Sequence, residues 1–196
     1  MKHGLLLTTV AGGVLALAAS ASAQSGFNWD GRPETLFMPN TSVVTTDKQF
    51  YDLTKKALLL LRLGVKAADE KATDDWTKSY NKELEDELMF MTNDLDDSLR
   101  RAGVTLGETK LSMTQQKFYN DFMRMAMHGF DGEYVKYTRT LTAGAAALFA
   151  AYIKQGTNTE IRGFAVKNRP RLLYFNRLAK ERATQMGYDK KTGNNF

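Results

Sequence analysis

One apolar stripe constrains the fold of this chain more than any other feature of its sequence. Between residues 74 and 102, apolar side chains recur at steps of three and four: Trp76, Tyr80, Leu84, Leu88, Met91, Leu95, Leu99 and Ala102. This is the spacing of one face of an α-helix, continued for about seven turns. A stripe of that length needs a large apolar partner surface, so we expect a bundle of helices built around this segment.

Four other segments have helical periodicity and can supply that surface. The sequence predicts helices over residues 47–70, 74–102, 113–128, 131–154 and 159–183. No segment has the alternation of apolar and polar residues that is typical of a strand. In the fourth helix, the small residues 143–147 would let a neighbouring helix come close.

Capping residues predict where several of these helices begin and end. We expect Asp47 and Thr73 to cap the first two helices, and a capping box to precede the third, formed by Ser112 with Gln115. Gly103 supplies a C-terminal stop for the second helix. Pro170 should kink the last helix, because proline lacks a backbone donor and clashes with the previous turn.

The first 23 residues are typical of a secretory signal peptide. A short basic start precedes the apolar segment 4–19, and Ala21-Ser22-Ala23 has the small-x-small pattern that signal peptidase cleaves. A transmembrane anchor is the alternative, but the apolar run is short for a bilayer span and contains Thr and Gly. We therefore expect cleavage after Ala23, export to the periplasm and no transmembrane segment in the mature chain.

The mature chain, residues 24–196, is long enough for one domain with its own core. It has no cysteine, which excludes disulfides, thiolate metal sites and cysteine nucleophiles. Loss of Lys2 lowers the formal net charge from +5 to +4, an excess too small to indicate nucleic-acid binding. We divide the mature chain into an extended N-terminal arm (24–46), a helical bundle (47–186) and a flexible C-terminal tail (187–196).

The arm is rich in large apolar groups although it has no helical periodicity, and a solvated linker would be poorer in them. One interpretation is that the arm lies in a groove of its own bundle. The other is that it docks on another protein, where aromatic anchors carry much of the binding energy. Under the second interpretation, the partner-binding residues are Phe27, Trp29, Leu36, Phe37 and Met38.

Charge is distributed unevenly along the bundle. Residues 69–97 contain eleven acidic residues against three lysines, whereas residues 162–191 contain nine basic residues against two acidic ones. The simplest interpretation is that two solvated faces of one bundle complement each other. The alternative is that each face binds a partner of opposite charge.

Three short motifs follow one another at the spacing of a known family. They are Gly103-Val104-Thr105-Leu106, Leu148-Phe149 and Phe164-Ala165-x-Lys167-x-x-Pro170. In these motifs the chain resembles the domain of unknown function 4142 family of bacterial secreted proteins, over residues 48–182. The resemblance implies a ferritin-like bundle. The expected fold is therefore all-α, with four to five helices and an extended N-terminal arm.

The chain lacks the histidines that are typical of this family. Members carry an Asp-His pair in the central helix, a second pair in the fourth helix and a His shortly after the proline of the last. The matching positions here are Glu87-Leu88, Leu141-Thr142 and Phe175. Inward imidazoles from three helices could together hold a metal ion, whereas Leu, Thr and Phe cannot. The resemblance thus implies the fold, but without these histidines it gives no support for a metal site.

Other chemistry has weak support in the sequence. His128 could form a loop site with Asp131 and Glu133, but a His near a helix C-terminus more often interacts with the helix dipole. Six methionines suggest either a Cu(I) site or, from their helical spacing, adaptable packing: Met89, Met91, Met113, Met123, Met125 and Met127. The sequence contains no phosphate-binding loop, nucleophile elbow or haem-attachment motif.

We expect a non-catalytic, cofactor-free periplasmic protein that works by binding. Its role would be that of an accessory or structural subunit that stabilises a partner protein or an enzyme complex. One candidate is the small subunit of a membrane-bound quinohaemoprotein alcohol dehydrogenase, a periplasmic oxidoreductase complex. The alternative is a ferritin-like metal-binding or stress-related protein. The sequence leaves the formation of a homo-oligomer open.

Overall fold

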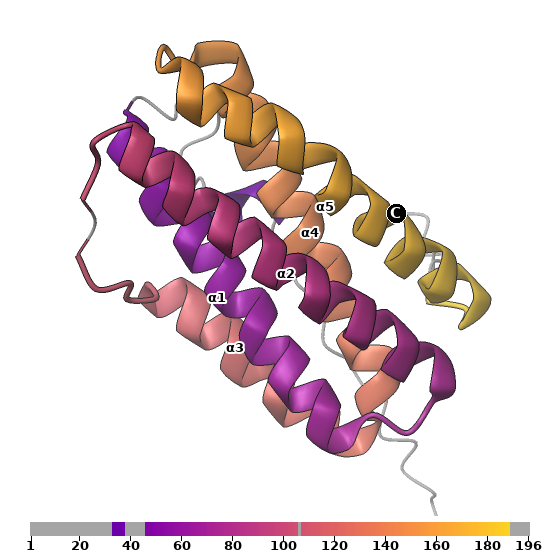
Figure 1. The fold of residues 1–196 in the computed structure, drawn as a ribbon. Coiled ribbons are helices and arrows are strands. Elements are labelled where there is room, and N and C mark those ends of the chain that lie inside the picture. Colours follow the sequence, from indigo (N-terminus) through magenta and orange to yellow (C-terminus); the bar gives the residue numbers. More distant parts are fainter. Residues whose placement is uncertain (1–32, 38–45, 106, 189–196) are drawn as a thin grey trace, which may run out of the picture.

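Five α-helices and two short 3-10 helices form the structure, a computed structural model that describes residues 33–37, 46–105 and 107–188 (Figure 1). The α-helices are α1 (Asp47–Lys71), α2 (Asp75–Arg101), α3 (Met113–Met125), α4 (Phe130–Gln155) and α5 (Thr159–Gln185). The 3-10 helices are η1 (Pro33–Leu36) and η2 (Ala126–His128). The described residues contain no strand, so the predicted all-α bundle is confirmed.

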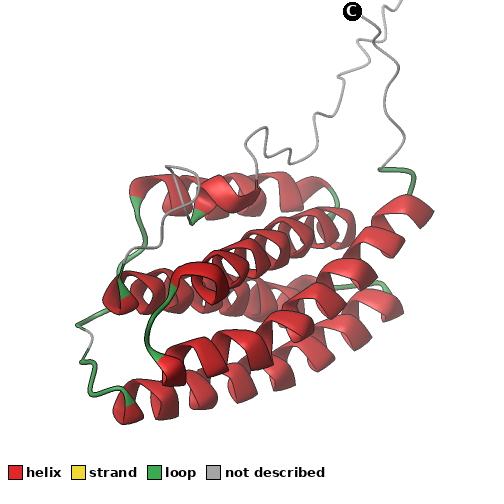
Figure 2. Cartoon of the chain, turned by 90° about the horizontal axis from the view of Figure 1, so that it is seen from above, coloured by secondary structure: helices red, strands yellow, loops and turns green. Residues whose placement is uncertain are grey.

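Helices α1, α2, α4 and α5 form a bundle in which each packs against two neighbours. Helix α2 lies between α1 and α5, and α4 closes the ring on the other side, while the shorter α3 and η2 pack against α4. Figure 2 shows the helices from above. Among the described residues, no helix combines the length and the apolarity that a membrane crossing requires.

The apolar stripe predicted for the central helix is the buried face of α2. Its middle residues, Leu84, Leu88, Met91 and Leu95, are almost completely enclosed by the neighbouring helices. Trp76 at the N-terminal end is half-buried and stacks on Tyr80, with ring centroids 4.9 Å apart. The stripe therefore supplies the centre of the core, as its length implied.

Two predicted N-caps are displaced by one residue. Helix α1 is capped by Thr46 instead of Asp47, because the Thr46 hydroxyl accepts a backbone hydrogen bond from the first turn at 3.1 Å. In α2 the N-cap position is occupied by Asp74 instead of Thr73, and the Asp74 side chain makes no capping hydrogen bond. The Thr73 hydroxyl instead donates a 2.6 Å hydrogen bond to Asp131 of α4. The Thr73 side chain, which the local sequence pattern predicted as the cap of α2, thus makes a tertiary contact with α4 instead.

The other predicted boundaries agree with the structure. Ser112 and Gln115 form the capping box of α3. Gly103 follows α2 with φ at 65°, in the left-handed region that favours glycine. Helix α5 continues through Pro170 to Gln185 as one helix.

Candidate interaction surfaces

The described part of the N-terminal arm, residues 33–37, is anchored in the bundle. Leu36 in η1 is 3% exposed, and the next residue, Phe37, is 0% exposed. The backbone carbonyl of Leu36 accepts a 3.1 Å hydrogen bond from the side-chain amide of Gln115 in α3. Gly144 in α4 leaves room for the ring of Phe37, since a Cβ atom there would lie 2.9 Å from Phe37 Cε2. These contacts make the end of the arm part of the core.

This placement corrects the prediction for two of the five partner-binding residues. Leu36 and Phe37 are buried by their own bundle, so their side chains offer no surface to another protein. For them the first interpretation of the arm applies, and Pro33–Leu36 forms a 3-10 turn where an extended chain was expected. Outside the described residues lie Phe27, Trp29 and Met38.

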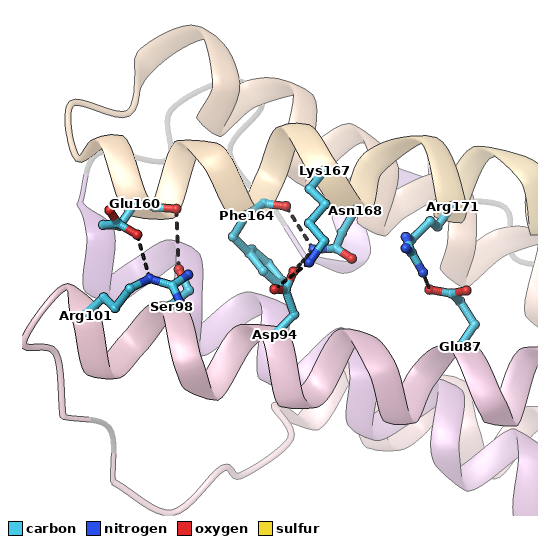
Figure 3. A network of polar contacts seen from close by, with 9 residues as sticks. All are labelled: Glu87, Asp94, Ser98, Arg101, Glu160, Phe164, Lys167, Asn168 and Arg171. Atoms are coloured by element: carbon cyan, nitrogen blue, oxygen red, sulfur yellow. Dashed lines mark hydrogen bonds and ion pairs between the residues drawn. The ribbon is translucent and has the colours of Figure 1, made fainter.

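Opposite charges on α2 and α5 pair across the seam between these two helices (Figure 3). The ammonium of Lys167 lies 2.8 Å from the carboxylate of Asp94. One turn further along α5, Arg171 pairs with Glu87. In Figure 3 these side chains point from the two helices toward each other. The seam is therefore held by charge-assisted hydrogen bonds as well as by the apolar core.

Two more ion pairs lie near the ends of the same seam. Arg182 approaches Asp74 at 2.6 Å. At the other end the polarity is reversed, because Arg101 of α2 donates to Glu160 of α5 at 2.7 Å. The interpretation that the acidic and basic segments complement each other within one bundle is thus confirmed for the pairs made by Lys167, Arg171 and Arg182.

Asp94 is the most enclosed carboxylate of the seam. Besides Lys167, the buried amide of Asn168 donates to it at 2.6 Å. Burial by itself raises the pKa of Asp94, but the hydrogen bonds from Lys167 and Asn168 outweigh it, so that the pKa lies below its usual value. The carboxylate accordingly remains charged at neutral pH and orients both donors.

Core side chains occupy the three positions that, from the resemblance, were expected to match family histidines. Leu88, Thr142 and Phe175 are all buried. The ring of Phe175 packs edge-on against Tyr80 at 5.6 Å between centroids. The hydroxyl of Thr142 donates to the backbone carbonyl of Thr138 at 2.7 Å. Phe175 and Thr142 thus each have partners of their own within the core.

The structure does not assemble His128, Asp131 and Glu133 as a metal site. Thr73 donates to the carboxylate of Asp131 from both its backbone and its hydroxyl, and Glu133 pairs with Lys136 at 2.9 Å. Burial raises the pKa of Asp131, but hydrogen bonds from Thr73 and the adjacent backbone bring it below its usual value. Throughout the described ranges, no group of three or more His, Asp or Glu residues could hold a metal ion.

The methionines divide between the core and the surface, so the expected packing in the core applies to three of the six. Buried or packed against the core are Met91, Met123 and Met125. Exposed at the surface are Met89, Met113 and Met127. Helical spacing placed all six on helices, but spacing alone does not decide which face a neighbouring helix covers.

A groove of about 580 Å³ between α1 and α2 was not foreseen from the sequence. From α1 its lining includes Arg62, Lys66 and Asp69, and from α2 it includes Glu85, Asp86 and Met89. The charges were visible in the sequence, but their adjacency depends on the packing of two helices.

Comparison with known proteins identifies a family. No curated protein and no solved structure matches the chain. A family model described as a domain of unknown function, DUF4142, matches residues 33–181. The match extends from η1 into α5, and so includes the anchor formed by Leu36 and Phe37 as well as the bundle. Because the matched segment is most of the chain, this protein belongs to the DUF4142 family of domains of unknown function.

Proposed function

We propose that this protein is a non-catalytic accessory subunit of the periplasm, which binds and stabilises a partner protein through the arm that precedes η1. The observation that carries the proposal is the anchoring of Phe37 in the core beside Gly144. The anchor fixes the point at which residues 24–32 join the bundle. A tether of this kind reduces the entropy that is lost when Phe27 and Trp29 bind another protein.

The composition of the arm and the extent of the family match support this role. Phe27 and Trp29 stand six and four residues before Pro33, and Trp is among the residues most enriched at binding hot spots. The family model begins at residue 33. Residues 24–32 therefore precede the part of the chain that the family shares, as a partner-specific element would.

The filled core favours a role without a cofactor. Leu88, Thr142 and Phe175 are buried, and the resemblance matched these three positions to histidines. A candidate partner is the membrane-bound quinohaemoprotein alcohol dehydrogenase complex, which contains a small helical subunit without a cofactor. The proposal requires only that the partner be a protein of the same compartment.

A deletion that spares the anchor tests the proposal. Removal of residues 24–32 should leave the helical content and the melting temperature unchanged but abolish co-purification of the partner from the native host. Removal of residues 24–37 should also lower the melting temperature, because it deletes the buried side chains of Leu36 and Phe37. Trp29→Ala should weaken the complex by about 2 kcal/mol or more, whereas Met113→Ala, on the exposed surface of α3, should not.

Two outcomes would contradict the proposal. A chain without residues 24–32 that keeps its partner at full affinity would exclude the arm from the mechanism. Stoichiometric metal in protein purified without an affinity tag would favour the ferritin-like metal-binding alternative.

A further inference from the structure

One side of α5 carries basic and apolar side chains at alternating positions. The residues follow one another at steps of four and three, so they share one side of the helix. We call them the α5 stripe: Arg162, Val166, Arg169, Leu173, Asn176 and Lys180. The side-chain amide of Asn176 donates to the backbone carbonyl of Arg139 in α4 at 2.8 Å. The stripe therefore borders α4, whereas Lys167 and Arg171 reach toward α2.

Much of the α5 stripe is open to solvent. Val166 is 53% exposed and Leu173 is 41% exposed, although both side chains are aliphatic. Arg162 and Lys180 are exposed as well. The packing of α4 against α5 (Figure 1) thus leaves two apolar side chains uncovered among bases. Exposed apolar groups with charged neighbours are typical of interaction surfaces.

Acidic residues are rare on this side of the molecule. Residues 134–180, which include most of α4 and α5, contain nine basic residues and one acidic residue, Glu160. The carboxylate of Glu160 pairs with Arg101 of α2 at 2.7 Å. The other acid of α5, Glu181, pairs with Arg177. Both acids of α5 are therefore already engaged by bases outside the stripe.

The three bases of the stripe have no carboxylate partner among the described residues. The ion pairs made there by bases of α5 involve four other side chains: Lys167, Arg171, Arg177 and Arg182. Arg162 donates to a backbone carbonyl, that of Gly156, at 3.5 Å. The charges of Arg162, Arg169 and Lys180 are thus available to an external anion.

We propose that the α5 stripe binds the surface of an anionic lipid bilayer, with α5 lying along the membrane. The three bases contact the phosphates of the lipid headgroups, and Val166 and Leu173 between them enter the apolar layer beneath. A nucleic acid or an acidic protein would match the bases alone, whereas the aliphatic side chains favour a partner with an apolar layer under its charges. The contact is peripheral and does not involve the arm, so it goes beyond the proposed function and does not depend on it.

Co-sedimentation of the mature chain, residues 24–196, with lipid vesicles tests the proposal. The probes are vesicles of phosphatidylcholine with and without phosphatidylglycerol, at an ionic strength of about 0.15 M. We expect binding to the anionic vesicles and much weaker binding to the neutral ones. A chain that does not bind the anionic vesicles, or that binds both kinds equally, would overturn the proposal.

Removal of the three unpaired charges should reduce the affinity for anionic vesicles. The triple variant should bind about a hundredfold more weakly, because each base near an anionic surface contributes a factor of about five: Arg162→Gln, Arg169→Gln and Lys180→Gln. The matched control removes three bases of α1, which α2 and α4 separate from α5: Arg62→Gln, Lys66→Gln and Lys71→Gln. Its effect should stay below about threefold, since salt screens distant charges. Circular dichroism verifies folding, and equal losses in the two variants would contradict the assignment to α5.

Replacement of the two aliphatic side chains distinguishes a membrane from other polyanions. Val166→Ser combined with Leu173→Ser should weaken vesicle binding by at least about tenfold, because fewer methyl and methylene groups enter the bilayer. Double-stranded DNA serves as a polyanion without an apolar layer, and the mature chain should bind it more weakly than the anionic vesicles. Vesicle binding that the serine variant retains in full, or DNA binding of equal strength, would overturn the assignment to lipid.

Discussion

The ring of Phe37 lies against the backbone of α4 at Gly144, where the structure leaves no room for a side chain. A Cβ atom at Gly144 would lie 2.9 Å from Phe37 Cε2 and would also overlap the backbone carbonyl oxygen of Pro33. The run of small residues in α4 was expected to admit a neighbouring helix. At Gly144 the small residue makes room for Pro33 and Phe37 of the arm instead.

We therefore predict that Gly144→Ala destabilises the protein. Alanine is the better helix former by about 1 kcal/mol, but the added methyl group would push against a backbone atom, and overpacking costs about 1–3 kcal/mol. The matched control is Gly163→Ala in α5, where a Cβ atom would meet nothing within 4 Å. That change should stabilise the protein by about 0.5–1 kcal/mol. Denaturant unfolding of both variants measures the two effects, and equal signs would contradict this account of the anchor.

Substitutions that shorten the core side chains Leu88 and Phe175 should be costly. Leu88→Ala should lower the free energy of unfolding by about 2–5 kcal/mol and Phe175→Ala by about 3–5 kcal/mol, through lost burial and a residual cavity. Leu173→Ala is the control, since Leu173 is exposed on α5, and its effect should stay within about 0.5 kcal/mol. Effects at Leu88 or Phe175 as small as that of the control would mean that these side chains are not core.

Asp94 should contribute a pH-dependent part of the stability. Its pKa in the folded protein lies below that in the unfolded chain, because the hydrogen bonds from Lys167 and Asn168 outweigh the burial that raises it. The stabilisation is fully present above the pKa of the unfolded chain and is lost as the pH falls through the folded-state pKa. Unfolding below about pH 4 should therefore be coupled to the uptake of a proton by Asp94. Asp94→Asn should reduce the slope of stability against pH in this range, and an unchanged slope would contradict the prediction.

Export should remove the leader. N-terminal sequencing of protein recovered from the periplasm should begin at Gln24, because the small-x-small pattern ends at Ala23. Protein that starts at Met1 and remains in the cytoplasm would contradict both the cleavage site and the predicted compartment.

The two displaced caps show where reading the sequence fails. Thr73 and Asp74 are both good N-cap residues, and nothing local distinguishes them. The choice is made by Asp131, which is 58 residues further along the chain and binds the Thr73 hydroxyl. Helix existence was predicted correctly, whereas the terminal residue depended on a contact that no local pattern contains.

The sequence by itself determined the all-α fold, the buried stripe of α2 and the capping box at Ser112. These features follow from periodicity and from hydrogen bonding within a few turns, so each is specified by the local sequence. Only the tertiary structure decided that Leu36 and Phe37 are core, because their burial depends on α3 and α4. It likewise decided that Glu87 meets Arg171, which is 84 residues away. Burial and charge pairing are properties of surfaces that come together only when the helices pack, and for that reason a residue's type and spacing could not place them.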